Sequence, residues 1–161
     1  MMRIGFGEDI HLFVEGRKLM LGGVEVPYEK GLLGHSDADA LLHAVTDALL
    51  GACRLGDIGR LYPPDDPKTE GIDSKKILAH VVELVREKGY RIINVDSNIV
   101  TESPKLKLHI PAIELSLARL LQIDEDCVSV KAKTNEGCDA VGEKKALRAN
   151  AIVLLEKGEN S

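Results

Sequence analysis

Strand-like and helix-like segments alternate along this chain, and the alternation narrows its possible folds more than any other feature of the sequence. Apolar residues follow the 3.6-residue period of a helix in some segments and alternate with polar residues in others. We expect strands over residues 2–6, 18–26, 91–100, 127–133 and 147–155, and helices over residues 38–52, 74–88 and 111–121. Strands separated by helices in one small chain indicate a layered α/β fold, with a mixed β-sheet and helices packed on one face.

Capping and turn-forming residues mark the ends of some of the predicted helices and strands. Asp73 is a suitable N-cap for the second helix, and Gly89 is a suitable stop. Gly22–Gly23 makes residues 18–26 either one bulged strand or a hairpin. The prolines and glycines of residues 57–71 predict a loop.

The size of the chain fits one domain. We expect a single domain over residues 1–157 and a frayed C-terminal tail over residues 158–161 of the 161-residue sequence. Two Phe, three Tyr and no Trp leave the core to aliphatic side chains. Helices on one face of the sheet leave the other face uncovered, and we expect another subunit of an oligomer to bury it.

Charge and cysteine usage exclude several classes of function. A net charge of -5 gives no general attraction to nucleic acid or to a membrane surface, so we expect neither as a partner. Three cysteines without CxxC spacing argue against a disulfide framework and against a cysteine zinc site. With no signal segment and no apolar stretch near 20 residues, we expect a complete, cytoplasmic chain.

Three residues form a candidate metal site. Asp9 and His11 point to the same side of an extended segment, and His43 lies on the first predicted helix. One carboxylate and two imidazoles suit Zn²⁺ with a fourth position open for a substrate oxygen. Asp39 and Asp47 continue a polar stripe with His43, so either carboxylate is a candidate to orient its ring. The alternative is a solvated strand end and a solvated helix face.

Three further segments are candidates for ligand binding. Gly56–Gly59 leads into a loop rich in Pro and Asp that is able to cover a site. Lys131–Gly137 and Thr101–Leu106 each follow a predicted strand, where ligands of α/β sheets often bind. Lys131–Gly137 offers hydrogen-bond donors for a phosphate and a carboxylate for a divalent cation. The alternatives are an ordinary surface loop and a helix-entry turn.

These segments, in this order, closely resemble the 2-C-methyl-D-erythritol 2,4-cyclodiphosphate synthase family of the non-mevalonate isoprenoid pathway. The resemblance spans residues 2–156, and its most specific parts are the motifs at Arg3–His11, Pro27–Asp39, Leu42–Ala52 and Leu55–Gly59. It implies a cyclodiphosphate-synthase-like catalytic domain that forms a homotrimer, with active sites between subunits.

The resemblance also implies cofactors and catalytic residues. It implies one Zn²⁺ per subunit on Asp9, His11 and His43, and a second cation, Mg²⁺ or Mn²⁺, bound with the substrate and by Glu136. It assigns transition-state stabilisation to His35 and Thr134. The implied substrate contacts are Asp9, Ile10, His11, His35, Ser36, His43, Asp57, Ile58, Gly59, Tyr62, Pro63, Pro64, Asp65, Asp66, Thr101, Glu102, Ser103, Pro104, Lys105, Leu106, Lys107, Lys133, Thr134, Asn135 and Glu136.

The implied reaction is an intramolecular phosphoryl transfer on a small cytidine diphosphate derivative. The 2-phosphate of 4-diphosphocytidyl-2-C-methyl-D-erythritol 2-phosphate attacks the β-phosphorus, and CMP leaves. The alternative is a metal-dependent hydrolase of nucleotide diphosphates, which shares the metals but needs a positioned water. The chain departs from the family pattern at Pro64, Lys133, Asn135, Ala140 and Glu143.

Overall fold

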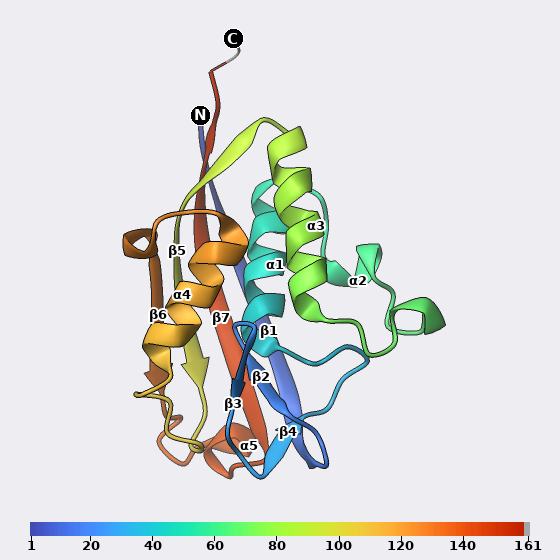
Figure 1. Ribbon diagram of the computed structural model, residues 1–161, viewed down its shortest axis with the longest axis vertical. Helices are drawn as coiled ribbons and strands as arrows, with labels where there is room; N and C mark the ends of the chain where they lie inside the picture. Colours follow the sequence, from blue (N-terminus) through green and yellow to red (C-terminus); the bar gives the residue numbers. More distant parts are fainter. Residues whose placement is uncertain (160–161) are drawn as a thin grey trace.

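A mixed five-stranded sheet is the central element of the fold in the computed structural model, which describes residues 1–159 (Figure 1). The strand order is β4-β1-β7-β5-β6, and only the β5–β6 pair is parallel. The strands are β1 (Met2–Glu15), β4 (Lys30–Leu32), β5 (Tyr90–Val100), β6 (Val128–Lys133) and β7 (Ala146–Lys157). The predicted layered α/β fold with a mixed sheet is confirmed.

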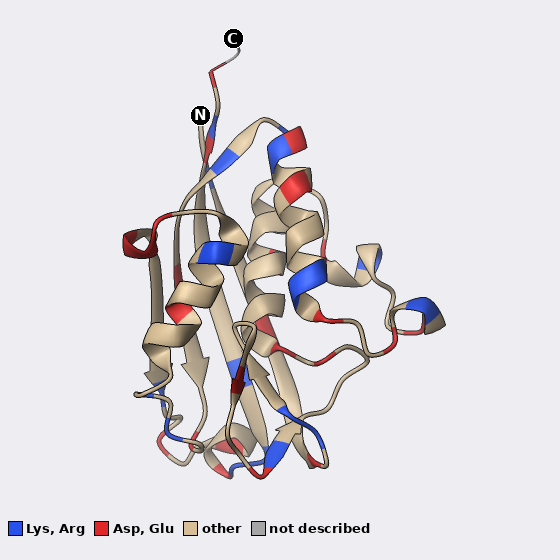
Figure 2. Ribbon diagram, in the orientation of Figure 1, with Lys and Arg blue, Asp and Glu red and all other residues tan. Residues whose placement is uncertain are grey.

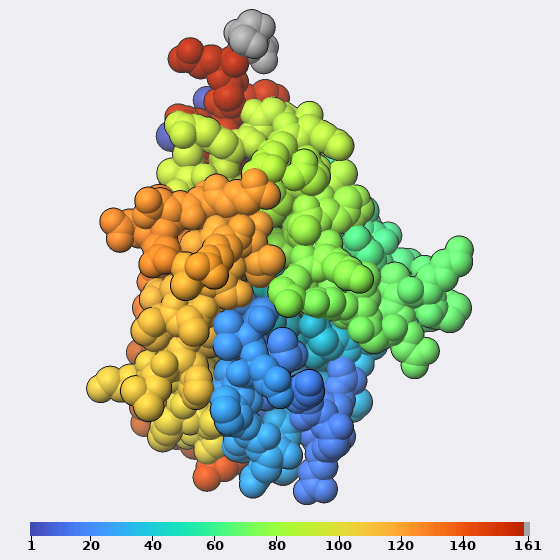
Figure 3. Space-filling model, in the orientation of Figure 1, coloured from blue at the N-terminus to red at the C-terminus, as the bar shows by residue number. Residues whose placement is uncertain are grey.

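The long helices cover one face of this sheet. They are α1 (Ala40–Ala52), α3 (Ser74–Glu87) and α4 (Ile110–Leu121). Figure 1 shows all three in front of the strands, and Figure 3 shows side chains of α3, α4 and the segment before α1 filling this side of the molecule. Helix α1 contains one charged residue, Asp47, so it is able to lie between the sheet and α3 (Figure 2).

The ends of these helices follow from local chemistry. The carboxylates of Asp39, Asp57 and Asp73 accept hydrogen bonds from backbone N–H groups in the first turns of α1, α2 (Ile58–Leu61) and α3. Gly89 follows α3 with φ +81°, a conformation that glycine adopts without steric cost. The predicted boundaries at Asp73 and Gly89 are therefore confirmed.

Several predicted elements have different bounds in the structure. The first strand does not end at residue 6 but continues to Glu15, because β7 pairs with it as far as Leu12 and β4 pairs with its last residues. Residues 18–26 form a hairpin of β2 (Leu19–Leu21) and β3 (Val24–Val26), since Gly22 and Gly23 both take positive φ.

Short elements also appear where the sequence predicted none. The 57–71 loop contains α2 and the 3₁₀-helix η1 (Pro67–Thr69), and Cys127 belongs to a second 3₁₀-helix, η2 (Glu125–Cys127). Strand β4 and helix α5 (Asp139–Gly142) were not predicted. These segments have three or four residues, too few to show a hydrophobic period.

Helix α1 rests directly on β1 because two glycines make room for it. A Cβ atom on Gly5 would lie 1.8 Å from the Ala48 carbonyl oxygen, and one on Gly7 would lie 1.8 Å from that of Ala44. No side chain fits at either position without moving the helix. This close contact places His43, the neighbour of Ala44, over the part of β1 that carries Asp9 and His11.

The opposite face of the sheet is apolar and uncovered in the single chain. Ile4, Phe6, Ile10, Leu12 and Ile152 lie there with 53–75% of their surface exposed. Such a patch is large for a protein that works as a monomer.

The start of β1 and the end of β7 lie together at one end of the molecule (Figure 1). Of the predicted tail, Gly158 donates a hydrogen bond to the Gly89 carbonyl, and residues 160–161 lie outside the described part of the chain. Within residues 1–159, the helices are too short or too polar to span a membrane.

Candidate active site

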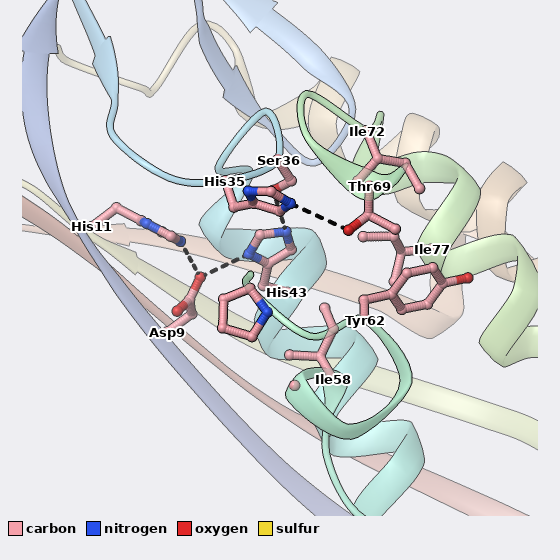
Figure 4. Close-up of a pocket in the computed structure, with 12 residues that line it drawn as sticks. Asp9, His11, His35, Ser36, His43, Ile58, Tyr62, Thr69, Ile72 and Ile77 are labelled. Carbon is pink, nitrogen blue, oxygen red and sulfur yellow. Dashed lines mark hydrogen bonds and ion pairs between the residues drawn. The ribbon is translucent and has the colours of Figure 1, made fainter. Parts of the chain in front are cut away.

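Asp9, His11 and His43 meet beside α1, as Figure 4 shows. Asp9 Oδ2 lies 2.6 Å from His11 Nε2 and 3.0 Å from His43 Nδ1. One potential ligand atom from each of the three residues lies within 4.8 Å of the others. Strand β1 supplies the first two residues and α1 supplies the third.

The far sides of both imidazole rings are also held. His11 Nδ1 lies 2.8 Å from the Leu33 carbonyl oxygen, which only accepts, so Nδ1 carries a proton and Nε2 faces Asp9. His43 Nε2 lies 2.8 Å from the Ser74 hydroxyl and 3.2 Å from the Ser36 hydroxyl. Each ring therefore presents one nitrogen to the cluster and has a partner for the other.

The cluster shifts the pKa values of Asp9 and His11. Burial alone would raise the pKa of the Asp9 carboxyl, but hydrogen bonds from His11 and His43 lower that pKa below its usual value. For His11, burial lowers the pKa, but the hydrogen bond and charge of Asp9 raise it above its usual value. The half-buried Asp9 is therefore held as a carboxylate, the form that binds metal.

This donor set fits a divalent cation of the zinc type. A carboxylate oxygen and two imidazole nitrogens are common zinc ligands, and three protein ligands leave a fourth position for a substrate. The carbonyl and hydroxyl partners behind the rings are typical of metal-bound histidines. The structure thus contains a potential metal site at these three residues.

The predicted role of Asp39 or Asp47 in orienting His43 is wrong. Asp39 is fully buried, and its carboxylate accepts hydrogen bonds from the N–H groups of Gly22, Gly23 and Leu42. Burial raises the pKa of Asp39 even though these three donors oppose the shift. Asp47 Oδ1 instead accepts from Ile58 N–H, which fixes the start of α2.

A cavity of about 230 Å³ opens beside the three potential ligands (Figure 4). The site residues predicted from the sequence that line this cavity are Asp9, His11, His35, Ser36, His43, Ile58, Gly59, Tyr62 and Pro64. Thr69, Ile72 and Ile77 also line it, and the sequence analysis missed them. Ile77 follows the apolar period of α3, so its sequence signal is that of a core residue.

His35 joins the loop before α1 to the segment that covers this cavity. Its Nε2 donates to the Asp66 carbonyl at 2.8 Å, and it lies 3.3 Å from the Thr69 hydroxyl. Arg17, also missed, donates to the carbonyls of Gly34 and Ser36 on either side of His35. The loop that carries His35 and Ser36 is therefore held from two directions.

A second cavity, of about 200 Å³, lies at the ends of β5 and β6. Its predicted members are Thr101, Pro104, Lys105, Leu106, Lys107, Lys133 and Thr134, and Ala132 also lines it. The two lysines at 105 and 107, with Lys133, give this cavity a positive rim.

The two cavities lie at different edges of the sheet. Asp9 pairs with Ala149, Ala149 with Ile99, and Ile99 with Ala132, so β1 and β6 are three strand spacings apart. At about 4.8 Å per spacing, Asp9 and the start of the Thr134 loop are about 14 Å apart within one chain. A single chain does not bring the two groups of predicted residues together.

The other predicted site residues line neither cavity. They are Ile10, Asp57, Pro63, Asp65, Asp66, Glu102, Ser103, Asn135 and Glu136. Ile10 lies on the uncovered face of the sheet, because strand residues alternate and Asp9 faces α1. The Glu102 carboxylate accepts from Asn135 N–H, which ties together the loops after β5 and β6. Glu136 is exposed in the second loop, away from the three potential metal ligands.

Comparison with known proteins gives a consistent result. The model of the YgbB family matches residues 2–156. The 2-C-methyl-D-erythritol 2,4-cyclodiphosphate synthase of Gloeobacter violaceus is 59% identical over 97% of this chain and 96% of its own length. A solved structure of such a synthase in a CDP-bound form is 42% identical, with a TM-score of 0.89 over 96% of this chain and all of that one.

A longer protein contains the same fold. The bifunctional IspDF of Campylobacter jejuni is 40% identical, with a TM-score of 0.94 over 98% of this chain but only 43% of that chain. The matched residues 2–156 include all those that line the two cavities, and this chain belongs to the YgbB family.

Proposed function

We propose that this protein converts 4-diphosphocytidyl-2-C-methyl-D-erythritol 2-phosphate to 2-C-methyl-D-erythritol 2,4-cyclodiphosphate and CMP, in isoprenoid precursor biosynthesis. It is then a cyclising phosphorus–oxygen lyase. Full-length similarity to synthases of that name supports the proposal. The observation that carries it is the convergence of Asp9, His11 and His43 beside an open cavity.

The reaction makes modest demands on acid–base chemistry. An oxygen of the 2-phosphate forms a bond to the β-phosphorus, and the bond to the CMP oxygen breaks with its electron pair. The attacking oxygen is already ionised near neutral pH, so no strong general base is required. The site must instead neutralise charge and align two phosphates that repel each other.

The proposed cofactors answer the charge requirement. Asp9, His11 and His43 would hold one Zn²⁺ per subunit, and Glu136 would contribute to a second site for Mg²⁺ or Mn²⁺ with the substrate. When bound, these cations neutralise the diphosphate and polarise the phosphate that is attacked.

The side chains of the two cavities are proposed to align the two phosphates. Ile58, Ile72 and Ile77 give the first cavity an apolar wall. His35 and Ser36 border the same space, and we assign His35 to stabilising the transition state. Lys133 and Thr134 offer an ammonium group and a hydroxyl in the second cavity, where Thr134 shares that role.

A homotrimer with active sites between subunits is part of this proposal. Its support is that the two cavities lie at different sheet edges, about 14 Å apart by strand spacing, so a neighbouring copy is needed to join them. The exposed apolar face of the sheet supplies a surface for the contact. The remaining expectations, a cytoplasmic enzyme with a small-molecule substrate, also belong to the proposal.

Product analysis of the wild-type protein tests the proposed reaction. Protein loaded with Zn²⁺ is incubated with the cytidyl substrate and Mg²⁺, and ³¹P NMR follows the phosphorus species. We expect CMP and a cyclic diphosphate in equal amounts. The variant His43→Ala should stay folded but lose zinc and turnover, whereas His109→Ala, outside both cavities, should keep both.

The same assay distinguishes the proposed cyclisation from the alternative, hydrolysis. A metal-dependent hydrolase would release CMP together with a linear bisphosphate. The relatives described above are named for cyclisation, and nothing in the two cavities favours hydrolysis. A linear product from the wild-type protein would overturn the proposed function.

A further inference from the structure

A buried chain of hydrogen bonds lies behind the potential metal ligands and reaches a third helix. Ser74, the first residue of α3, is fully buried. Its hydroxyl donates to Asp37 Oδ1, and its backbone N–H donates to Asp37 Oδ2 at 3.1 Å. The other side of the same hydroxyl lies 2.8 Å from His43 Nε2. Asp37, Ser74 and His43 therefore form one connected chain that ends at Asp9.

The direction of the protons in this chain follows from the groups themselves. The Asp37 carboxylate only accepts hydrogen bonds, so the single proton of the Ser74 hydroxyl points toward it. The hydroxyl then offers only a lone pair to His43. A bare Nε2 at 2.8 Å would place two lone pairs against each other, so Nε2 carries a proton. On the other side of the ring, Nδ1 faces Asp9 Oδ2 at 3.0 Å, and a metal ion bound there would replace the proton between them.

The second hydroxyl near this nitrogen does not replace Ser74. Ser36 Oγ is more distant, at 3.2 Å, and it already accepts a hydrogen bond from Ala38 N–H at 3.1 Å. It has no carboxylate partner to fix its own proton. Ser36 therefore tolerates either form of the ring, whereas Ser74 permits one.

We propose that Ser74, oriented by Asp37, is a positioning residue that holds His43 with Nε2 protonated and Nδ1 directed at the metal site. This inference rests on the proposed function only in taking His43 as a metal ligand. The start of α3 thereby contributes to a site whose ligands come from β1 and α1. Without the hydroxyl, the His43 ring loses the contact that selects its tautomer and its rotation.

Metal affinity tests this role without relying on turnover. Competition with a chromophoric chelator gives the zinc affinity of the wild-type protein, Ser74→Ala and Asp37→Asn. We expect Ser74→Ala to bind zinc about 10- to 100-fold more weakly, the usual effect of losing a residue that orients a metal ligand. Asp37→Asn should act in the same direction, because one of its two accepting oxygens becomes a donor.

A second buried serine provides the matched control. Ser97 is 2% exposed, and its hydroxyl donates to the Ser129 carbonyl at 2.9 Å, away from both cavities. Ser97→Ala removes a comparable hydrogen bond, so any general loss of stability affects it equally. Its zinc affinity should equal that of the wild-type protein.

Nitrogen NMR of histidine-labelled, zinc-loaded protein gives the specific signature. In the wild-type protein, we expect His43 to show a protonated Nε2 whose proton exchanges slowly with water. In Ser74→Ala, that protection should be lost while the His11 signals stay unchanged. Equal zinc affinity and equal exchange in Ser74→Ala and wild type would overturn the inference. Failure of the wild-type protein to bind zinc would instead count against the proposed function.

Discussion

Individual aspartate side chains in this protein join separate segments of the chain by accepting backbone hydrogen bonds. Asp39 is buried at the point where the β2–β3 hairpin meets the start of α1, and it accepts hydrogen bonds from both. Its neighbours Asp37 and Asp47 hold the starts of α3 and α2. Each acidic residue thus joins two segments near the site rather than facing solvent.

The variant Asp39→Ala should lower the free energy of unfolding by about 3 kcal/mol, since it leaves buried N–H groups of Gly22 and Leu42 without an acceptor. Urea denaturation followed by circular dichroism measures the change. The comparison is Asp73→Ala, which removes a more exposed cap from α3 and should cost about 1 kcal/mol. Equal losses in the two variants would show that the hairpin contact contributes nothing.

The variant Glu136→Gln should raise the Mg²⁺ concentration that half-maximal activity requires, without changing the zinc content. The side chain is exposed in the loop after β6 and is separate from Asp9, His11 and His43. Steady-state assays over a range of Mg²⁺, with zinc measured by atomic absorption, check both parts. Loss of zinc from this variant would contradict the assignment of Glu136 to the second cation.

At the scale of elements, the site depends on how closely α1 approaches β1. Gly5 and Gly7 remove the side chains that would otherwise separate the helix from the strand. His43 is then near enough to share Asp9 Oδ2 with His11. The cluster is therefore a product of helix–strand packing as much as of its three side chains.

The variant Gly7→Ala should reduce zinc binding and lower the free energy of unfolding by about 3 kcal/mol, because its Cβ would meet the Ala44 carbonyl oxygen at 1.8 Å. The control is Gly51→Ala at the end of α1, where a Cβ meets nothing within 4 Å. There we expect a gain of up to about 1 kcal/mol from helix propensity. Unchanged zinc affinity in Gly7→Ala would mean that the helix spacing does not position His43.

At the scale of the whole molecule, one chain has two separate cavities and an uncovered apolar face. The first cavity, beside Asp9, lies near β1, and the second cavity, beside Lys133, lies near β6. Strands β7 and β5 lie between them. Ile4, Phe6 and Ile152 lie exposed on the face that the helices leave free. Association of chains through this face is the arrangement that we propose.

Co-expression of two inactive variants should restore activity if the sites lie between subunits. His43→Ala alters the first cavity and Thr134→Ala the second, so a mixed oligomer regains intact sites wherever two unaltered cavities meet. The measurement is turnover of the co-purified, differently tagged chains against each variant alone. Activity no higher than that of the separate variants would place the whole site within one chain.

The variant Phe6→Asp, introduced into both chains, is the control for assembly. A charge on the apolar face should reduce the oligomer to monomers in analytical ultracentrifugation and abolish the restored activity. Asp9, His11 and His43 face the other side of the sheet and stay intact.

Short-range patterns in the sequence were enough to predict the fold class, most long elements and the pairing of Asp9 with His11. These features depend on residues two to four positions apart, or on a cap next to its helix, and local geometry governs such distances. Asp73 and Gly89 mark the ends of α3 for the same reason.

The sequence grouped His43 with Asp9 and His11, but only the tertiary structure shows them in contact and adds Ser74 behind the His43 ring. His43 is 34 positions from Asp9 and 31 from Ser74, and both contacts depend on glycine-lined packing and on where α3 begins. The polar spacing of Asp39 and Asp47 suggested partners for this ring, but the hairpin and α2 bind those carboxylates instead. Local periodicity tells which side of a helix a residue occupies, whereas the partner on that side is set by the packing of distant segments.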